Sequence, residues 1–514
     1  MKKYIAALDQ GTTSTRCIFF DAEGQICASH QLEHKQIFPE PGWVEHDPHE
    51  IWQRTQDVIA ACLRKADAKG SDIAAVGLTN QRETTLLWNP KTGEPFGNAI
   101  VWQDMRTSDR VEELIAEHGK DWLREKTGLP LAAYFSGTKL EWILNNRPDA
   151  RAAALRGEAV FGTMDTYLCW QLSGGAGGGG PRKGGRGGVH ITDSTNASRT
   201  LLMNIVSREW DPALLDIFSI PHQILPEIYP SIPSAPYGYT DPRGPFGAEI
   251  PIAGILGDQQ AALFGQTCFE AGESKNTYGT GCFLLMNSGT EIVYSSHGLI
   301  STVAYQIGDE PARYALEGSI AIAGSLIQWL RDNLGIIKTS AEVESLALSV
   351  KDSGDVYFVP AFSGLYAPHW CGDARGIIAG LTGFANAGHI ARAALEATAF
   401  QSLEIMQAME SDSGRKLSDI RVDGGMVVNE TLMQFQSDIS GLPVIRPRIA
   451  ETTALGAAYA AGLAVGFWKD RESLRGYWHE DRRWEPKMQA DDCARRIRRW
   501  QQALERSRGW ASLS

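Results

Sequence analysis

A carboxylate followed by small hydroxyl residues stands near the start of the chain. The segment Asp9-Gln-Gly-Thr-Thr-Ser-Thr-Arg16 places a glycine turn and four consecutive hydroxyl residues directly after a hydrophobic run. Successive backbone N–H groups and hydroxyls in such a turn can hold phosphate oxygens, and Asp9 can face an accompanying magnesium ion through water. An ordinary hairpin turn has the same composition, so this segment alone leaves both interpretations open.

A second turn of this kind follows near the middle of the chain. Thr277-Tyr-Gly-Thr-Gly281 again sets hydroxyls and glycines before a hydrophobic run, and Val422-Asp-Gly-Gly425 is a third glycine-bearing strand end. A phosphate chain held between two domains needs donors from both sides, and glycine lets a nucleotide base approach the backbone. Neither the Gly-x-x-x-x-Gly-Lys-Ser/Thr loop nor the His-Arg-Asp catalytic loop is present, which excludes P-loop and protein-kinase architectures.

Two polar segments are candidates for holding a substrate. Asn80-Gln-Arg-Glu-Thr84 and Gly257-Asp-Gln-Gln260 each follow a hydrophobic run that is typical of a buried strand. Ligand sites in α/β folds lie beyond the carboxyl ends of strands, so both segments suit a cleft in which Asp258 is a general base. The alternatives are a surface ion pair for Arg82 and Glu83 and a helix cap for Asp258.

The elements that must position these residues indicate an α/β fold with two halves of similar build. Residues 4–29 predict an antiparallel meander of three strands, followed by a helix over about 49–69 and a buried strand over 73–78. In the second half we expect helices at about 389–410, 430–440, from 452 and from 490, with strands at 282–286, 420–423 and 444–446.

The halves are expected to meet in Pro- and Gly-rich sequence over 226–251, which gives domains of residues 1–252 and 253–514. Residues 174–188 contain ten glycines, and Gly175-x-Gly-x-x-Gly180 matches the dinucleotide-binding fingerprint by letters alone. We interpret that segment as a flexible surface loop, because the fingerprint needs a strand before it and a helix after it.

Composition narrows the function classes. Of the 514 residues 49 are basic and 61 acidic, and this net charge of −12 argues against a nucleic-acid binder. The apolar stretch 454–468 is shorter than the roughly 20 residues of a membrane span and contains three glycines, so we expect a close-packed helix there. The first residues lack a signal-peptide cleavage site, and we expect a cytoplasmic protein that does not insert into membranes.

The residues described so far resemble the FGGY family of carbohydrate kinases, within the actin-like ATPase superfamily, over nearly the whole chain. Several segments carry the resemblance together: 7–14 (ALDQGTTS), 41–48 (PGWVEHDP), 79–85 (TNQRETT), 134–139 (YFSGTK) with Trp142, 257–265 (GDQQAALFG), 276–281 (NTYGTG), 423–425 (DGG), and the signature from Gly376 through Gly380 to His389 and Glu396.

The resemblance implies two ribonuclease-H-like domains flanking a deep cleft, with glycerol deep in the cleft and ATP with Mg²⁺ across its mouth. The implied reaction is phosphorylation of glycerol to sn-glycerol 3-phosphate, the first step of glycerol catabolism. Erythritol, xylulose and dihydroxyacetone are the alternative substrates within the family, and a non-catalytic actin-like module is the alternative outside it. The resemblance also favours a homodimer or homotetramer.

Site roles carry over at matching positions. Asp258 is the implied catalytic base, and Asp9 and Asp258 the implied metal ligands. The implied glycerol contacts are Arg82, Glu83, Trp102, Tyr134, Asp258, Gln259 and Phe283. The implied nucleotide contacts are Thr12, Thr13, Ser14, Arg16, Thr280, Gly324, Gln328, Gly425 and Asn429.

Three departures from the family pattern stand out: the glycine-rich loop 174–188, an altered segment 364–373, and residues 243–249, which lack the glycine-and-lysine loop of regulated bacterial members. Pro245 removes a backbone donor, and Glu249 stands where those members have an arginine. A carboxylate repels the two phosphates of fructose 1,6-bisphosphate, so we expect that this effector does not inhibit the protein.

Overall fold

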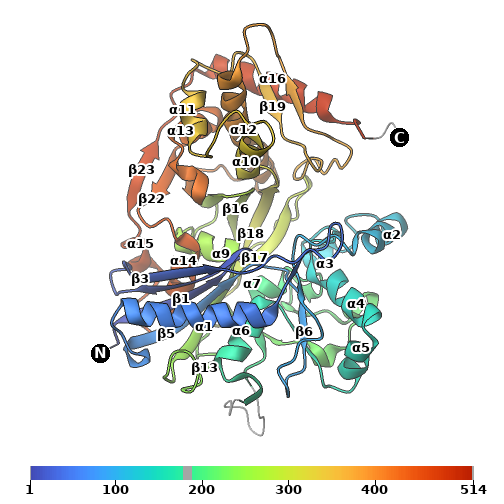
Figure 1. The fold of residues 1–514 in the computed structure, drawn as a ribbon, viewed down its shortest axis with the longest axis vertical. Coiled ribbons are helices and arrows are strands. Elements are labelled where there is room, and N and C mark those ends of the chain that lie inside the picture. Colours follow the sequence, from blue (N-terminus) through green and yellow to red (C-terminus); the bar gives the residue numbers. More distant parts are fainter. Residues whose placement is uncertain (1, 178–187, 512–514) are drawn as a thin grey trace.

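The computed structural model describes residues 2–177 and 188–511 and shows two twisted sheets with helices packed around and between them (Figure 1). The first sheet has the strand order β13-β14-β5-β1-β2-β3 and the second the order β17-β18-β16-β15-β21-β22-β23. The strands of the first sheet are β1 (Tyr4–Gln10), β2 (Ser14–Phe20), β3 (Ile26–Glu33), β5 (Ile73–Asn80), β13 (Gly238–Tyr239) and β14 (Pro251–Gly257). Those of the second are β15 (Ser274–Tyr278), β16 (Cys282–Gly289), β17 (Ile300–Tyr305), β18 (Arg313–Ile320), β21 (Ile420–Asp423), β22 (Val444–Pro447) and β23 (Glu480–Trp484).

Both sheets repeat one plan. In the first, β1 and β2 are antiparallel, β2 and β3 are antiparallel, and β5 runs parallel to both β1 and β14. In the second, β15 and β16 are antiparallel, β16 and β18 are antiparallel, and β21 runs parallel to both β15 and β22. The predicted α/β fold with two halves of similar build is confirmed, and a glycine turn follows the first strand of each meander.

The helices begin where the sequence supplies the caps. Helix α1 (Pro48–Lys65) starts with proline at its first position, and the Asp47 carboxylate accepts a hydrogen bond from the backbone of His49. Its buried face packs against β2 and β3. The other predicted helices are observed as α12 (Ala387–Ser413), α13 (Glu430–Ser440), α14 (Thr452–Ala464) and α16 (Ala490–Ser507).

Two small-residue helices, α14 and α9 (Asp258–Gly265), form the packed centre between the sheets (Figure 1). They share one buried cluster with β1 and β2 of the first sheet and with β16, β17 and β18 of the second. A Cβ placed on Gly456 would lie 1.8 Å from the Ala261 carbonyl oxygen, and one on Gly265 would lie 2.0 Å from the Thr452 carbonyl oxygen. The apolar stretch is therefore the close-packed helix expected from the sequence, because only glycine allows this approach.

Several expectations concern segments that the structure describes in part. Residues 178–187 of the glycine-rich loop lie outside the described residues. The described Gly175–Gly177 form a 3₁₀ turn after helix α6 (Met164–Leu172), so the strand that a dinucleotide fingerprint needs does not precede them.

The expected domain boundary after residue 252 falls within β14, and its position stays a prediction. None of the helices in the described residues combines the length and hydropathy that crossing a membrane requires.

We predict that Gly456→Ala destabilises the protein although alanine is the better helix former. Helix propensity alone would stabilise α14 by about 1 kcal/mol, whereas the clash with Ala261 forces a backbone shift that costs about 1–3 kcal/mol or more. Calorimetric or fluorescence melting should show a lower unfolding temperature. The matched control is Gly383→Ala, since nothing lies within 4 Å of a Cβ at Gly383. An unchanged or raised unfolding temperature for Gly456→Ala would contradict the close packing of α9 and α14.

Candidate active site

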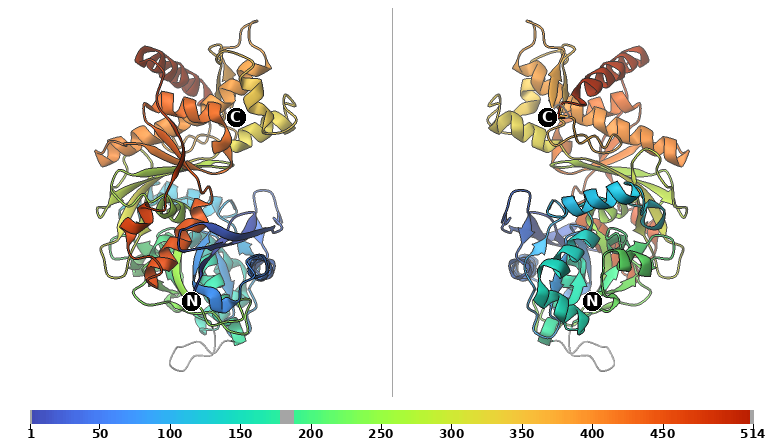
Figure 2. Two further views of the ribbon diagram at one scale, coloured as in Figure 1. Left: turned by 90° about the vertical axis from the view of Figure 1, so that its left-hand side faces the viewer. Right: turned by 90° about the vertical axis from the view of Figure 1, so that its right-hand side faces the viewer.

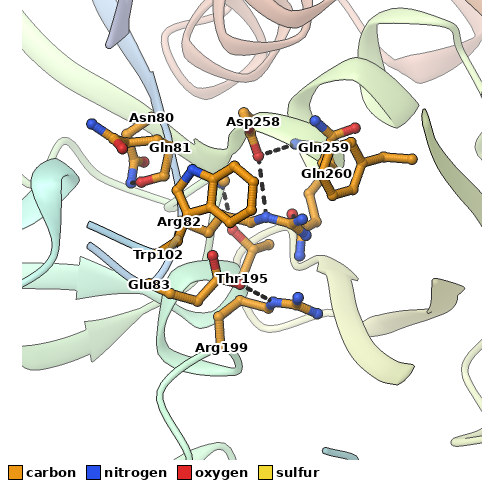
Figure 3. A network of polar contacts seen from close by, with 12 residues as sticks. Asn80, Gln81, Arg82, Glu83, Trp102, Thr195, Arg199, Asp258, Gln259 and Gln260 are labelled. Carbon is orange, nitrogen blue, oxygen red and sulfur yellow. Dashed lines mark hydrogen bonds and ion pairs between the residues drawn. The ribbon is translucent and has the colours of Figure 1, made fainter. Parts of the chain in front are cut away.

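A buried ion pair joins the two sheets at the predicted substrate cluster. Arg82 follows β5 and is 3% exposed, and its guanidinium donates to both carboxylate oxygens of Glu317 on β18 at 2.5 and 3.0 Å. The same guanidinium donates to Gln260 Oε1 at 3.2 Å, and its Nε lies 3.1 Å from Asp258 Oδ1 (Figure 3). Two parallel N–H···O bonds fix the plane of Arg82 as well as its position.

A second buried arginine completes this network. Arg199 lies just after helix α7 (Ser194–Ala197) and donates from Nε to Glu83 at 2.6 Å and from Nη2 to Glu317 at 3.1 Å. Glu83 has a backbone φ of 59°, a left-handed conformation that is strained for a residue with a side chain. The interpretation of Arg82 and Glu83 as a surface ion pair is wrong, because both are buried and each pairs with a residue distant in sequence.

The network fixes the charge states of its carboxylates. Burial alone would raise the pKa of Glu317, but the Arg199 and Arg82 guanidiniums outweigh it and lower that pKa to about 2. Burial raises the pKa of Glu83, and Arg199 opposes this increase. Glu317 is therefore a permanent anion between two cations. The anionic form of Glu83 is stabilised less, because burial outweighs the effect of Arg199 on its pKa.

Three aromatic rings form one wall of the site. The ring of Trp102 lies 5.5 Å from that of Tyr134 and 6.4 Å from that of Phe283, both in edge-to-face geometry. The Trp102 Nε1 donates to the Thr12 hydroxyl at 2.9 Å, which ties this wall to the first glycine turn. The structure thus brings the seven predicted glycerol contacts together around Arg82, from both sheets and the loops between them.

Asp258 is the first residue of α9 and faces the pocket from its rim. Its Oδ1 accepts from the Gln259 backbone N–H at 2.7 Å and faces Arg82, whereas its Oδ2 has no protein donor among the described residues. A helix cap bonds the N–H groups two or three residues ahead, so the capping interpretation does not hold. With 28% of its side chain exposed, Asp258 keeps one oxygen open to a ligand.

On the second sheet, the predicted nucleotide residues surround one turn. The Thr280 carbonyl accepts from the Ala323 backbone at 3.0 Å, and the N–H of Gly324, at the start of α10 (Gly324–Asp332), donates to the Gly279 carbonyl at 3.0 Å. A Cβ on Gly324 would lie 3.4 Å from Met426 Sδ, next to Gly425. Gln328 follows one turn along α10, and Asn429 caps α13. These five predicted residues are therefore neighbours on one edge of the second sheet.

The first glycine turn is held by side chains from β3 and beyond. The Thr12 carbonyl accepts from the ring of His34 and the amide of Gln36, each at 3.0 Å. Arg16 forms an ion pair with Glu451, the residue before α14, and also donates to Gln31 at 2.6 Å. Thr13 and Ser14 lie in the same turn, and the Ser14 hydroxyl accepts from Gln31. Arg16 is thus engaged with protein partners, and its nucleotide role stays a prediction.

The residues present fit a magnesium ion. Burial raises the pKa of Asp9 to about 6, Arg16 lowers it, and Asp258 raises it further. No donor from the described residues contacts the Asp9 carboxylate, so two carboxylates near each other lack full compensation. A divalent cation with oxygen ligands would supply it. In the described part of the chain no group of three or more acidic, His or Cys side chains gathers as a ligand set, and Mg²⁺ would complete its shell with water and phosphate.

Sequence reasoning missed three buried charged residues whose side chains bond to the side chains of predicted glycerol contacts: Arg199, Lys275 and Glu317. A charged residue inside a hydrophobic strand was the available signal for Glu317, in the run Tyr314-Ala-Leu-Glu-Gly-Ser-Ile320, and for Lys275 on β15. Buried charges are rare unless paired, so such positions indicate a site. Arg199 lies in a loop and carried no such signal.

The structure also describes the other two segments that depart from the family pattern, residues 364–373 and 243–249. Trp370 of the altered segment donates to the Gly298 carbonyl at 2.7 Å. Arg243 of the expected regulatory loop pairs with Asp241 at 2.5 Å and donates to the Gly177 carbonyl at 3.0 Å, while Glu249 is exposed. The expected effects of these segments on affinity and on inhibition by fructose 1,6-bisphosphate stay predictions.

Two repeated α/β halves, each with a glycine turn after its first strand, meet at the polar cluster around Arg82. Models of the N-terminal and C-terminal domains of the FGGY family of carbohydrate kinases match residues 4–265 and 274–465. The chain belongs to the FGGY family of carbohydrate kinases.

Similar proteins of known sequence or structure include three named glycerol kinases and one xylulose kinase. The chain is 59% identical to a glycerol kinase of Chloroflexus aggregans over 510 residues, 99% of this chain and 100% of the relative. It is 56% identical to a glycerol kinase of Beijerinckia indica over 516 residues, 100% of both chains. The crystal structure of Plasmodium falciparum glycerol kinase with ADP is 39% identical, has a TM-score of 0.90 and covers 98% of each chain. A xylulose kinase from Lactobacillus acidophilus, at 22% identity and a TM-score of 0.84, shares the fold.

We predict that Asp9→Asn stabilises the ligand-free protein at alkaline pH. The folded pKa of about 6 exceeds the ordinary 3.8, so between these values the folded state binds more protons, and wild-type stability falls as pH rises. The variant should gain about 1–2 kcal/mol above pH 6 and nothing below pH 4, since Asp9 is only partly buried from solvent. Unfolding temperatures at pH 4 and pH 8, without magnesium or nucleotide, measure the gain.

The matched control for this pH dependence is Asp241→Asn. The Arg243 guanidinium lowers the pKa of Asp241 to about 2. Replacing the Asp241 carboxylate should therefore give a small loss of stability at pH 8. Equal unfolding temperatures of Asp9→Asn and wild type at pH 8 would show that Asp9 carries no uncompensated charge.

Proposed function

We propose that this protein transfers the terminal phosphoryl group of ATP to a primary hydroxyl of glycerol, giving sn-glycerol 3-phosphate and ADP. The observation that carries the proposal is the cluster of Arg82, Glu83 and three aromatic rings, placed beside an acceptor carboxylate and glycine turns. Full-length identity to proteins named glycerol kinase supports the same substrate. A cytoplasmic location and a homodimer or homotetramer belong to the proposal.

The hydrogen-bonding capacity left over in the pocket suits a polyol. Arg82 has five N–H groups, and its hydrogen bonds to Glu317 and Gln260 use three of them, while its Nε lies 3.1 Å from Asp258 Oδ1 as an ion pair. Arg199 occupies Glu83 Oε1, which leaves Glu83 Oε2 as an acceptor. A free Arg82 donor and the free Glu83 acceptor together match a hydroxyl, which both donates and accepts. The aromatic wall packs against the carbon chain.

In the proposed reaction Asp258 Oδ2 accepts the proton of the attacking hydroxyl. The glycerol oxygen forms a bond to the terminal phosphorus as the bond from that phosphorus to the bridging oxygen breaks, and ADP leaves with the electron pair. Backbone N–H groups of the turns around Thr12 and Thr280 stabilise charge on the transferring group. Bound near Asp9 and Asp258, Mg²⁺ would supply neutralisation of the phosphate charge.

Two alternatives differ from the proposal in what they need from the pocket. An FGGY kinase for erythritol, xylulose or dihydroxyacetone would keep the turns but would need room for its own substrate. A non-catalytic actin-like module would not need Asp258 Oδ2 open or Glu83 in a strained backbone conformation. Strain at a residue that faces a pocket favours a binding role for that residue.

We predict a clear preference for glycerol in ADP-release assays with equal concentrations of glycerol, dihydroxyacetone, erythritol and xylulose. Buried polar groups left unpaired by an ill-fitting substrate reduce kcat/KM strongly, so the preferred substrate should stand out by a factor of ten or more. A preference for xylulose would show that the protein is a kinase whose substrate is xylulose and not glycerol. Tight ATP binding without ADP formation on any polyol would favour the non-catalytic module.

We predict that Asp258→Asn lowers kcat by about 10²–10⁴, the contribution of a positioned general base. Asparagine keeps the shape and the contact with the Gln259 backbone but cannot accept the proton. Binding of ATP, measured by calorimetry, should change little. Asp241→Asn serves as the control, since Asp241 forms a surface ion pair with Arg243. Undiminished kcat in Asp258→Asn would show that another group is the base.

A further inference from the structure

Lys275 is a buried lysine that the proposed reaction does not use. It lies on β15 with no exposed surface, and its ammonium donates to the Gln259 side-chain oxygen, to the Thr277 hydroxyl at 2.8 Å and to the Phe283 carbonyl at 3.2 Å. An ammonium has three N–H donors and no acceptor, so these three contacts satisfy it completely. No carboxylate of the described residues forms an ion pair with it, although desolvating a cation is costly.

The contact with Lys275 decides which end of the Gln259 amide meets a ligand. Because an ammonium can only donate, the amide oxygen must face Lys275, and the amide nitrogen points away from it. That nitrogen has no protein acceptor among the described residues, although only 7% of Gln259 is exposed. Gln259 is therefore held as a pure hydrogen-bond donor beside Asp258, in the orientation that a substrate hydroxyl oxygen needs.

Through Thr277, Lys275 is also connected to Asp423, which precedes the predicted nucleotide residue Gly425. The Thr277 hydroxyl accepts from Lys275, so its single hydrogen goes to Asp423 Oδ1 at 2.5 Å. The other oxygen of Asp423 accepts from Gln266 at 2.9 Å and from Thr452 at 2.8 Å. Every bond in this chain has a fixed direction, and Asp423 accepts three hydrogen bonds in a buried network.

Asp423 is the last residue of β21 and precedes the glycine pair at 424–425. Gly424 has a φ of 92°, and a Cβ there would lie 2.5 Å from the Tyr278 carbonyl oxygen. The start of this turn is thus clamped between β15 and β21. The hydrogen bonds of the Asp423 side chain therefore hold the residue that directly precedes this turn.

We propose that Lys275 is a positioning residue that couples the two substrate sites, because it orients the Gln259 amide for the polyol and, through Thr277, holds Asp423 beneath the nucleotide turn. This inference deepens the proposed kinase function and rests on it. Lys275 touches neither substrate: it acts through Gln259 on one side and through Thr277 on the other.

A double-mutant cycle tests the first arm. Lys275→Met and Gln259→Leu should each raise the KM for glycerol about tenfold, the effect of losing one oriented hydrogen bond. In the Gln259→Leu background, Lys275→Met should raise that KM no further, because the residue through which it acts is gone. Full additivity of the two changes would overturn the orienting role.

Thr277→Val tests the second arm, since it removes the hydroxyl relay and leaves the contact between Lys275 and Gln259. The expected result is a raised KM for ATP with an unchanged KM for glycerol, whereas Lys275→Met should raise both. An unchanged KM for ATP in Thr277→Val overturns the coupling. Thr277→Val also decides this point if Lys275→Met lowers the unfolding temperature too far for assay.

Lys139→Met is the matched control, because Lys139 is also fully buried and donates at 2.5 Å to the carbonyl of Tyr134, a pocket residue. It should leave the KM for ATP unchanged and be additive with Gln259→Leu.

Wild-type protein is first assayed with glycerol, dihydroxyacetone, erythritol and xylulose. If another polyol is preferred, the glycerol assignment fails and the cycle is run with that polyol. If none is turned over, dissociation constants from calorimetry replace KM.

Discussion

The bidentate pair between Arg82 and Glu317 is the constraint on which the site depends. It links the end of β5 in the first sheet to β18 in the second, and Glu317 also receives Arg199, which in turn holds Glu83. Removing one partner from such a buried network would leave an uncompensated charge, at a cost of about 3–5 kcal/mol. The same contact therefore orients the donors of the site and links the two halves.

Packing around this network explains its rigidity. The glycines of α9 and α14 bring two helix backbones into contact, and both helices share one buried cluster with strands of the two sheets. In Figure 2 the orange-red segment that contains α14 lies beside the blue strands of the first sheet. Asp258 is the first residue of α9, so the helix that forms the centre of the fold also places the proposed base. Close packing leaves little freedom for rotamer changes, and buried polar groups keep one arrangement of hydrogen bonds.

The carboxylates of the site differ in how far the protein compensates their charge, and this difference separates structural from reactive groups. Glu317 lies between two arginines and stays ionised, whereas the Asp9 carboxylate has no hydrogen-bond donor among the described residues and has a raised pKa. Carboxylates that the protein itself neutralises hold structure, and carboxylates that it leaves uncompensated are available to a metal ion or a proton. Lys275 is a buried cation with a structural role of its own, because its three N–H groups all donate to neighbouring residues.

The sequence by itself determined the repeated α/β plan, the glycine turns after β1 and β15, the close-packed helix α14, and the polar segments at strand ends. These are local properties, since hydrophobic runs, caps and turn residues act within a few positions. Only the tertiary structure decided which charges meet. Arg82 and Glu83 are adjacent in sequence but pair with Glu317 and Arg199, more than one hundred positions away. Such pairings depend on how the two sheets pack, because a buried charge takes whichever counter-charge the fold places beside it, and no local pattern records that distance.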